Sequence, residues 1–220
     1  MAAINSDDVL RALGYRGAAD GLTRSGAARA AEEITAVARP RAVWKLLALR
    51  RESGRLFVGE GELTGRDIAR HLEGCYECAA LCVTLGVGTD SAIRAAESTS
   101  ISHAAALDSA ASALCEAECE ELESALRERL AHEGKYTTSR FSPGYGDWPI
   151  EANLMLAERL DASRSAGISV SASGALLPRK SVIALCGVSD VSVKGVLAGC
   201  KSCKLKDKCD KTNGGRLCER

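Results

Sequence analysis

Apolar residues recur at helical spacing in several stretches of the chain. Residues 24–39 place small apolar side chains on one face, and Pro40 ends the predicted helix. A much longer helix is expected from about Ser102 to His132, with Gly134 just beyond its end. The apolar stripe of this long helix consists of Leu107, Ala111, Leu114, Leu122, Leu126 and Leu130.

Capping residues and a proline mark the starts of further helices. The polar segment 5–8 precedes apolar residues and predicts a short helix there. Thr64 and Asp67 are expected to cap a second helix, and Asp90 a third. The last helix should follow Pro149, because proline suits a first helical turn. Its buried stripe is expected to consist of Ile150, Leu154, Ala157 and Leu160.

Short segments between the helices have the pattern of strands. Residues 41–49 and 168–173 alternate between apolar and other positions, although a helix is an alternative for the first. Residues 79–86 and 181–187 are almost continuously apolar, as expected for buried strands. Helices interspersed with strands, without regular βαβ repetition, predict an α+β fold with a mainly antiparallel sheet flanked by helices.

Composition and charge narrow the class of protein. Of the 220 residues, 46% are hydrophobic and 26% are charged, which suits a soluble domain with a substantial core. The 29 basic and 29 acidic side chains cancel, so the chain has no overall positive charge for nucleic acid. No apolar run approaches the ~20 residues that span a bilayer, and no secretory signal is recognised. We therefore expect a cytoplasmic protein that binds neither nucleic acid nor membrane.

Glycines between a strand and a helix raise the question of a phosphate site. Gly59, Gly61 and Gly65 follow an apolar segment and precede a predicted helix, which is the order found in dinucleotide-binding folds. Their spacing is one residue too long for that fingerprint, and no acidic residue ends a second strand at the required distance. A helix cap at Thr64 is the simpler interpretation.

Six of the ten cysteines lie within predicted helices or strands or beside them. Cys75 and Cys78 form a C-x-x-C pair that suits redox chemistry or half of a metal site, but the adjoining apolar run with Cys82 favours buried thiols. Cys115 and Cys119 lie on one face of the long helix and are also expected to be structural. The acidic residues among them, Glu116, Glu118, Glu120, Glu121 and Glu123, are expected to form a solvated face.

The composition changes abruptly at Gly199. Residues 199–220 carry four cysteines in a C-x2-C-x5-C-x8-C pattern among many lysines and arginines, with almost no apolar residue. Such a segment has no core of its own, but a metal held by four thiolates can order it. We therefore predict a domain over 1–198 and a metal-binding tail over 199–220. The alternative is a disordered basic tail whose cysteines bind no metal. The ligands of zinc or of an iron–sulfur cluster would be Cys200, Cys203, Cys209 and Cys218.

The segment 139–151, SRFSPGYGDWPIE, concentrates residue types that are rare elsewhere in the chain. The chain has two Trp, two Phe and four Tyr, and half of these lie in or beside this segment. Pro143 and Gly144 predict a turn, with Arg140 before it and Tyr145 after it. A guanidinium suits a carboxylate, and an aromatic face suits a cation or a flat ring. A plain loop leading into a helix is the alternative.

The pattern Arg140-x-x-Pro143-Gly144-Tyr145 resembles the S-adenosylmethionine-binding signature of the activation domain of cobalamin-dependent methionine synthase. The residues that follow it, as far as 187, are similar to the same domain's helix, strand and proline-containing crossover. Looser similarity, closest to free-standing versions of the domain, extends over roughly residues 5–195. The resemblance implies that Arg140 holds the methionine carboxylate. It also implies that the turn Pro143–Tyr145 offers backbone hydrogen bonds to the ligand.

The resemblance implies a reactivation protein for a cobalamin-dependent methyltransferase, above all methionine synthase. In that family, one electron and a methyl group from S-adenosylmethionine convert inactive cob(II)alamin to methylcobalamin. The chain has no Asp-x-His-x-x-Gly motif, so the cobalamin should arrive on the methyltransferase partner.

An electron donor such as a flavodoxin or a ferredoxin would be a second partner. The need for an electron favours an iron–sulfur cluster over zinc in the tail. The alternative function is that of a non-catalytic zinc-binding adaptor.

Overall fold

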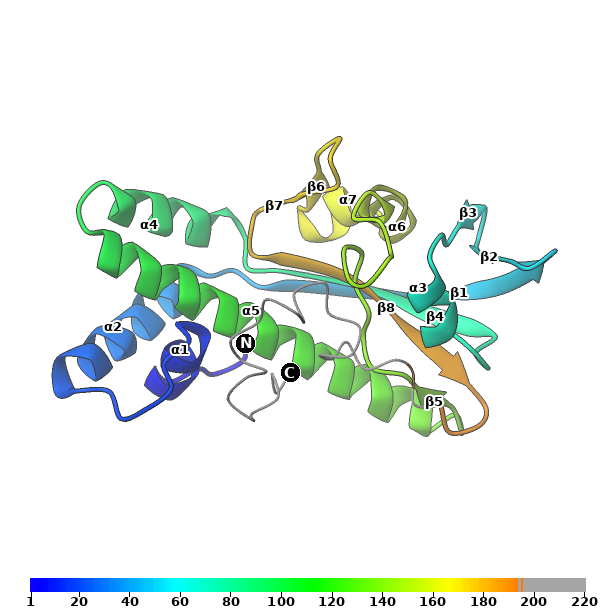
Figure 1. The fold of residues 1–220 in the computed structure, drawn as a ribbon, viewed down its shortest axis with the longest axis horizontal. Coiled ribbons are helices and arrows are strands. Elements are labelled where there is room, and N and C mark those ends of the chain that lie inside the picture. The colour runs from blue at the N-terminus through cyan, green and yellow to red at the C-terminus, as the bar shows by residue number, and fades with distance from the viewer. Residues whose placement is uncertain (194, 196–220) are drawn as a thin grey trace.

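The structure is a computed structural model that describes residues 1–193 and 195, and its fold is α+β (Figure 1). Within this part of the chain, six strands form a sheet in the order β3-β2-β1-β4-β8-β5, and all neighbours are antiparallel. The predicted antiparallel sheet flanked by helices is confirmed. The strands, including the separate pair β6–β7, are β1 (Arg41–Glu52), β2 (Arg55–Val58), β3 (Gly61–Glu62), β4 (Glu77–Thr84), β5 (Tyr136–Thr137), β6 (Ser169–Val170), β7 (Leu176–Leu177) and β8 (Ser181–Ser189).

Strand β4 lies between β1 and β8 and is buried on both faces. Successive side chains of a strand point to opposite faces of the sheet. Accordingly, Cys78, Ala80 and Cys82 belong to one apolar cluster, whereas Ala79 and Leu81 belong to another. The continuous apolar run that predicts a buried strand therefore serves two cores, one on each face.

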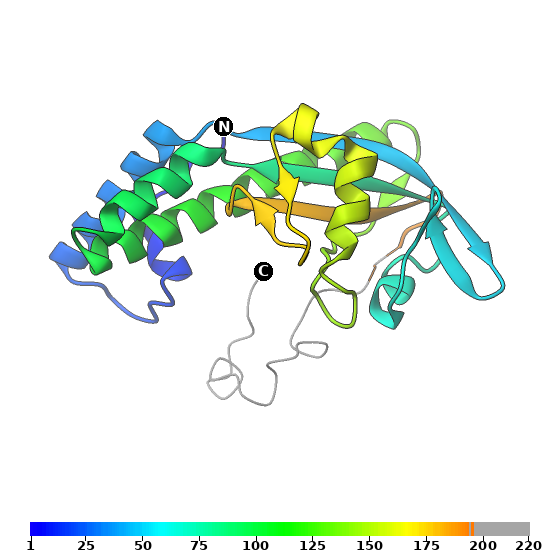
Figure 2. The ribbon, with the colours of Figure 1, turned by 90° about the horizontal axis from the view of Figure 1, so that it is seen from above.

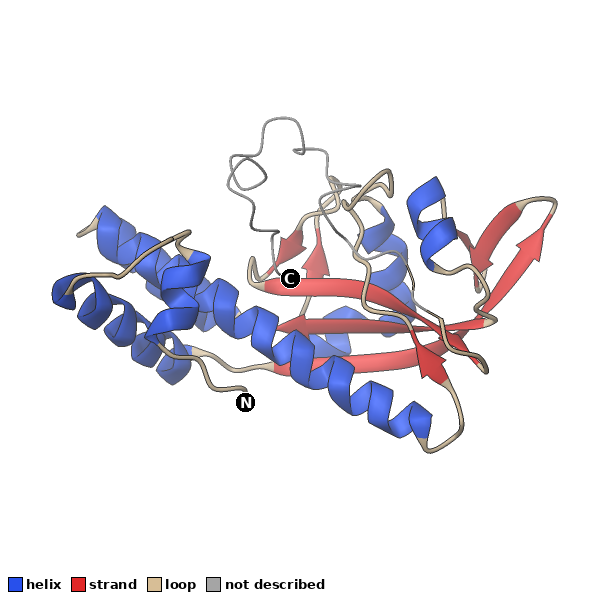
Figure 3. Ribbon diagram, turned by 60° about the horizontal axis from the view of Figure 1, so that its bottom comes forward, coloured by secondary structure: helices blue, strands red, loops and turns tan. Residues whose placement is uncertain are grey.

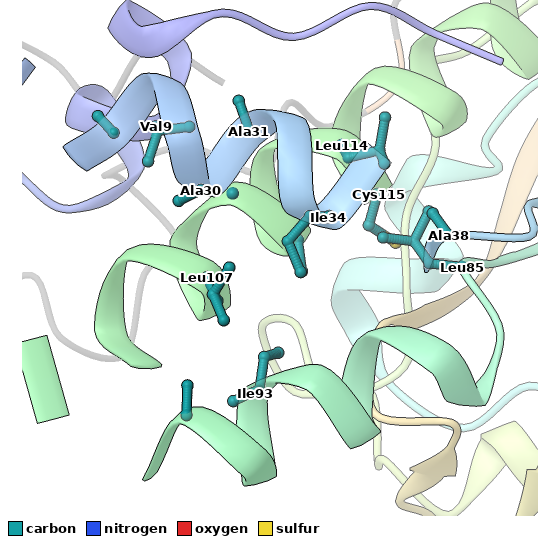
Figure 4. Packing of buried hydrophobic residues seen from close by; sticks show 14 of the residues in the cluster. Val9, Ala30, Ala31, Ile34, Ala38, Leu85, Ile93, Leu107, Leu114 and Cys115 are labelled. Atoms are coloured by element: carbon teal, nitrogen blue, oxygen red, sulfur yellow. The ribbon is translucent and has the colours of Figure 1, made fainter. Parts of the chain in front are cut away.

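The N-terminal helices pack together at one end of the sheet (Figure 2). Ile34, Ile93 and Leu107 come from three different helices and share one apolar cluster, shown in Figure 4. Buried alanines such as Ala30 let the helix backbones approach closely. The helices of this layer are α1 (Ser6–Ala12), α2 (Gly21–Val37), α4 (Val87–Glu97) and α5 (Ile101–Ala131).

Helix α5 leaves this layer and continues along one face of the sheet (Figures 1 and 3). Its second half buries Leu126 and Leu130 against Leu81, Ala184 and Val188. The predicted stripe of the helix is confirmed, because its leucines face either the helical layer or the sheet. No described helix combines the length and the apolar character that crossing a membrane requires.

Helices α3 (Arg66–His71), α6 (Ala152–Leu160) and α7 (Ala162–Ala166) cover the other face of the sheet. The stripe predicted for the helix after Pro149 is wrong in part. Ile150 and Leu154 are 43% and 44% exposed, whereas Asn153 and Leu156 are buried. The cause is that α6 begins only at Ala152, so the face that meets the sheet is set by later residues.

Two of the three predicted helix caps are corrected by the structure. Asn5 caps α1 as expected, since its side chain accepts from the backbone of Asp7 and Asp8. Helix α3 begins after Gly65 without a local side-chain cap, so Thr64 has no such role. Asp90 lies inside α4 and accepts a hydrogen bond from the backbone N–H of Arg179 at 2.8 Å.

The cysteines of the described residues are buried thiols. Cys75, Cys78 and Cys82 are at most 2% exposed, which confirms the prediction that they pack in the core. Burial raises the pKa of Cys78 to about 12 and that of Cys82 to about 11, so these thiols stay protonated at neutral pH. The predicted metal ligands Cys200, Cys203, Cys209 and Cys218 lie outside the described residues.

Candidate functional site

The segment that carries the signature extends the edge of the sheet beyond β5. The N–H of Thr138 donates to the carbonyl of Gly187 at 3.0 Å. Phe141 and Leu185 exchange both of their backbone hydrogen bonds, at 2.8 and 2.9 Å. Arg140 is thus held on a rigid edge next to β8, and the turn that follows begins where this pairing ends.

Neighbouring side chains on this edge take opposite directions. Phe141 is buried in the cluster beneath α6, with its ring centroid 6.1 Å from that of Trp148 and 4.9 Å from that of His71. Arg140 points the other way and meets α5. The alternation of an extended segment therefore separates the cation from the aromatic cluster.

Arg140 is bound by two carboxylates of α5. Its Nη1 donates to Oε2 of Glu123 at 2.8 Å, and its Nη2 donates to Glu116. Burial alone would lower the pKa of Arg140, but the carboxylates of Glu116 and Glu123 together raise it above the usual value. The guanidinium is therefore a fixed positive charge at any physiological pH.

The glutamate run on α5 is not uniformly solvated, which corrects the prediction. Glu118 is buried and accepts from the backbone N–H of Ala2 at 2.7 Å. Glu123 is also buried, and it lies between two arginines. Arg140 donates to its Oε2, and Arg127 donates to its Oε1 at 3.0 Å. Sequence reasoning missed Glu116 and Glu123 as partners of Arg140. Their spacing of seven residues, two helical turns, places them on one face of α5, but no pattern in the sequence pairs that face with Arg140.

The turn itself satisfies its own backbone amides. Gly144 N–H donates to Trp148 O at 2.9 Å, and Tyr145 N–H donates to Ser142 O at 3.2 Å. Gly144 has φ of 92°, a conformation that favours glycine. Hydrogen bonds to a ligand would therefore come from the carbonyls of Pro143 and Gly144, which accept no backbone N–H from the described residues.

Asp147 fastens the turn to the N-terminus of α3. Its carboxylate accepts from the backbone N–H groups of Arg66 and Asp67, both at 2.9 Å. In turn, the carboxylate of Asp67 accepts a hydrogen bond from the backbone N–H of Asp147 at 3.3 Å. A Cβ at Gly65 would lie 3.0 Å from Oδ1 of Asp147, so this glycine permits the close approach. The amides that a phosphate would need at α3 are thus used by Asp147.

The predicted site residues fall into two groups. Pro143, Gly144 and Tyr145 form one turn, and Tyr145 is 40% exposed with its ring centroid 6.2 Å from that of Phe141. Arg140 precedes this turn and faces α5. The arrangement presents a guanidinium, backbone carbonyls and an exposed phenol ring along one edge of the sheet.

No protein-family model matches the sequence, and no curated protein matches it. A solved structure, the crystal structure of the MetH reactivation domain bound to AdoHcy, does match the fold with a TM-score of 0.60. The alignment covers 96% of this chain and 84% of that chain, at 17% sequence identity. The chain therefore has the fold of that reactivation domain over nearly its whole length, as the resemblance around Arg140 implies.

Proposed function

We propose that this protein binds S-adenosylmethionine and reactivates a cobalamin-dependent methyltransferase, in the first place methionine synthase. The observation that carries the proposal is the fold shared with an AdoHcy-bound reactivation domain, together with the signature from Arg140 to Tyr145. AdoHcy is what remains of S-adenosylmethionine after its methyl group has been transferred, so the two ligands share their recognition groups.

The chemistry of the edge residues fits such a ligand. The guanidinium of Arg140 suits the carboxylate of the methionine moiety. The carbonyls of Pro143 and Gly144 suit N–H donors of the ligand, and the exposed ring of Tyr145 suits a sulfonium or an adenine face. This protein's share of the reaction would be to position the methyl donor.

Cobalamin would be carried by the methyltransferase partner, whose cobalt accepts the methyl group. The reductive methylation of cob(II)alamin consumes one electron and one methyl cation equivalent and yields methylcobalamin and S-adenosylhomocysteine. The protein binds and orients the methyl donor for this step, and a flavodoxin or a ferredoxin would supply the electron.

We also propose that residues 199–220 form a metal-binding tail after a domain over 1–198. The support is the spacing of Cys200, Cys203, Cys209 and Cys218 in a lysine-rich segment. An iron–sulfur cluster fits the electron requirement of the proposed reaction. Stoichiometric zinc in place of a cluster would favour a non-catalytic adaptor.

The proposal is tested by calorimetric titration of the full-length protein with S-adenosylmethionine and AdoHcy. Arg140→Lys keeps a cation beside the buried Glu123 but loses the planar fork, so the fold is retained while carboxylate binding weakens. The expected loss is about 1.5–3 kcal/mol, on the order of tenfold or more in affinity.

Arg127→Ala is the matched control, because Arg127 also binds Glu123 but lies outside the signature. It should bind both ligands nearly as the wild type does. Absence of binding by the wild type would rule out the proposed ligand, and equal affinities for wild type and Arg140→Lys would remove Arg140 from the site.

A further inference from the structure

Arg140 is held by two carboxylates with very different exposure to solvent. The side chain of Glu123 is 11% exposed, and its two oxygens are bound by Arg140 and Arg127. The side chain of Glu116 is 48% exposed and meets only Arg140 among the charged groups of the described residues. Glu123 is therefore a fixed partner, whereas Glu116 can move into water at little cost.

The nitrogen that Glu116 binds decides what else Arg140 can hold. A guanidinium binds a carboxylate with two parallel hydrogen bonds, either from Nη1 and Nη2 or from Nε and Nη2. In this chain Arg55 binds Glu62 through Nε and Nη2, with the Nε hydrogen bond at 2.8 Å. Both arrangements use Nη2, which in Arg140 is bound to Glu116.

The other nitrogens of Arg140 show where a second carboxylate fits. Nη1 is bound to Glu123, and Nε donates to no group within the described part of the chain. The edge formed by Nε and Nη2 is therefore where a ligand carboxylate can bind while Glu123 stays on Nη1. Nη2 carries two N–H groups, and the carboxylate of Glu116 on this nitrogen repels a second carboxylate on the same edge. The repulsion ends when Glu116 leaves Nη2.

We propose that Glu116 is an internal competitor for the carboxylate of the ligand, and that Glu123 is a positioning residue that holds Arg140. The inference rests on the proposed function, since the ligand is an adenosyl sulfonium amino acid. A ligand carboxylate displaces Glu116 from the edge formed by Nε and Nη2, while Glu123 retains Nη1. Affinity is thereby reduced for every ligand that must displace Glu116, and is unaffected for nucleosides that have no carboxylate.

The test is calorimetry on the full-length protein with S-adenosylmethionine and with 5′-methylthioadenosine, which lacks the amino-acid moiety. Glu116→Gln should tighten S-adenosylmethionine binding by up to about fivefold, the range expected for an exposed ion pair. It should leave 5′-methylthioadenosine binding unchanged. Glu123→Gln should weaken S-adenosylmethionine binding by roughly tenfold, because the guanidinium loses its buried anchor. Glu120→Gln is the control, since Glu120 is exposed on the same helix and forms no ion pair with Arg140.

A second measurement does not require the nucleoside ligand. The arginine reagent phenylglyoxal should modify Arg140 faster in Glu116→Gln than in the wild type or in Glu120→Gln, as followed by peptide mass spectrometry. An equal rate would show that Glu116 does not shield the guanidinium, and would overturn the inference.

The titrations separate the possible failures. Wild-type binding of S-adenosylmethionine with unchanged affinity in Glu116→Gln would overturn the competition and leave the proposed function intact. Weaker binding in Glu116→Gln would assign Glu116 to the ligand's ammonium group and also overturn the competition. Absence of S-adenosylmethionine binding by wild type and all variants would overturn both proposals.

Discussion

Asp147 and Asp67 join two parts of the chain that are 80 residues apart. Each carboxylate accepts a hydrogen bond from the backbone of the other segment, so the turn after Pro143 and the start of α3 are fixed together. A carboxylate at a helix N-terminus is also favoured by the helix dipole. Asp147 therefore caps the N-terminus of α3 from a distant segment, as Asn5 caps α1 from the adjoining residue.

Asp147→Ala removes the acceptor of two backbone N–H groups and should destabilise the protein by about 0.5–2 kcal/mol, the usual cost of a lost cap. For a domain of this size the melting temperature should fall by roughly 1–8 °C. Glu120→Ala, which removes an exposed carboxylate of α5, is the control and should melt like the wild type. The measurement is thermal unfolding followed by circular dichroism at pH 7.

The effect of Asp147 should depend on pH. Hydrogen bonds from the N–H groups of Asp67 and Arg66 lower the pKa of Asp147 below its ordinary value. A depressed pKa means that the carboxylate stabilises the fold above a pH of about 4 and stops doing so as the pH falls through the folded-state pKa. The difference in melting temperature between wild type and Asp147→Ala should therefore shrink below pH 4. A constant difference would show that charge is not involved.

Single residues are predictable from sequence when their partners are close along the chain. The cap at Asn5 follows from its own segment, because the amides that it binds are two and three residues away. The roles of Asp147 and Asp90 depend on backbone groups about 80–90 residues away, which no local pattern reveals. The same holds for Glu123, since an acidic run on a helix is usually solvated. Its partner Arg140 comes from the segment that follows the edge strand β5, 17 residues further along the chain.

At the scale of elements, the C-x-x-C pair belongs to the packing between α3 and the sheet. A Cβ at Gly187 would lie 2.5 Å from Sγ of Cys75, so the thiol fills the space beside β8 completely. Cys78 has no exposed surface. A hydroxyl at position 78 would be buried in an apolar cluster, and one at position 75 would be buried near the carbonyl of Glu73. A buried hydroxyl without a hydrogen-bond partner would destabilise the fold.

The double variant Cys75→Ser/Cys78→Ser should therefore melt several degrees below the wild type, since each unsatisfied hydroxyl costs about 1–3 kcal/mol. Cys75→Ala/Cys78→Ala is the matched variant that removes both thiols without adding a polar group, and it should lose less. The metal content of both variants should equal that of the wild type when measured by elemental analysis. A lower content would show that the pair binds metal.

Long elements with a regular pattern of apolar positions are predictable from sequence, and strands of two residues are not. The stripe of α5 and the apolar run of β4 each extend over many residues, so their type is clear before the structure is known. Strands β5, β6 and β7 have two residues each and exist only through pairing with other segments. The expected strand over 168–173 accordingly shrinks to Ser169–Val170.

For the whole molecule, the candidate site depends on the order of strands in the sheet. Strand β8 comes last along the described chain but lies between β4 and β5, which places the signature segment at the sheet edge beside α5. Antiparallel pairing of strands that are distant in sequence leaves no local pattern. The fold class was therefore predictable, whereas the meeting of Arg140 with α5 was not.

The last prediction concerns residues 199–220, which lie outside the described residues. Among the described residues, the clusters on both faces of the sheet and in the helical layer extend from Ala2 to Val188. Deleting 199–220 should therefore leave the melting temperature nearly unchanged and S-adenosylmethionine binding intact.

The full-length protein, purified without oxygen, should contain iron and absorb at about 400 nm, as thiolate–iron clusters do. Cys203→Ser should lose this absorbance and its iron, because a four-cysteine site depends on every ligand, whereas Cys82→Ser, at a buried position of β4, should retain both. Stoichiometric zinc without absorbance would contradict the cluster and favour the adaptor. Loss of the fold on deletion of 199–220 would show that the tail contributes to the core.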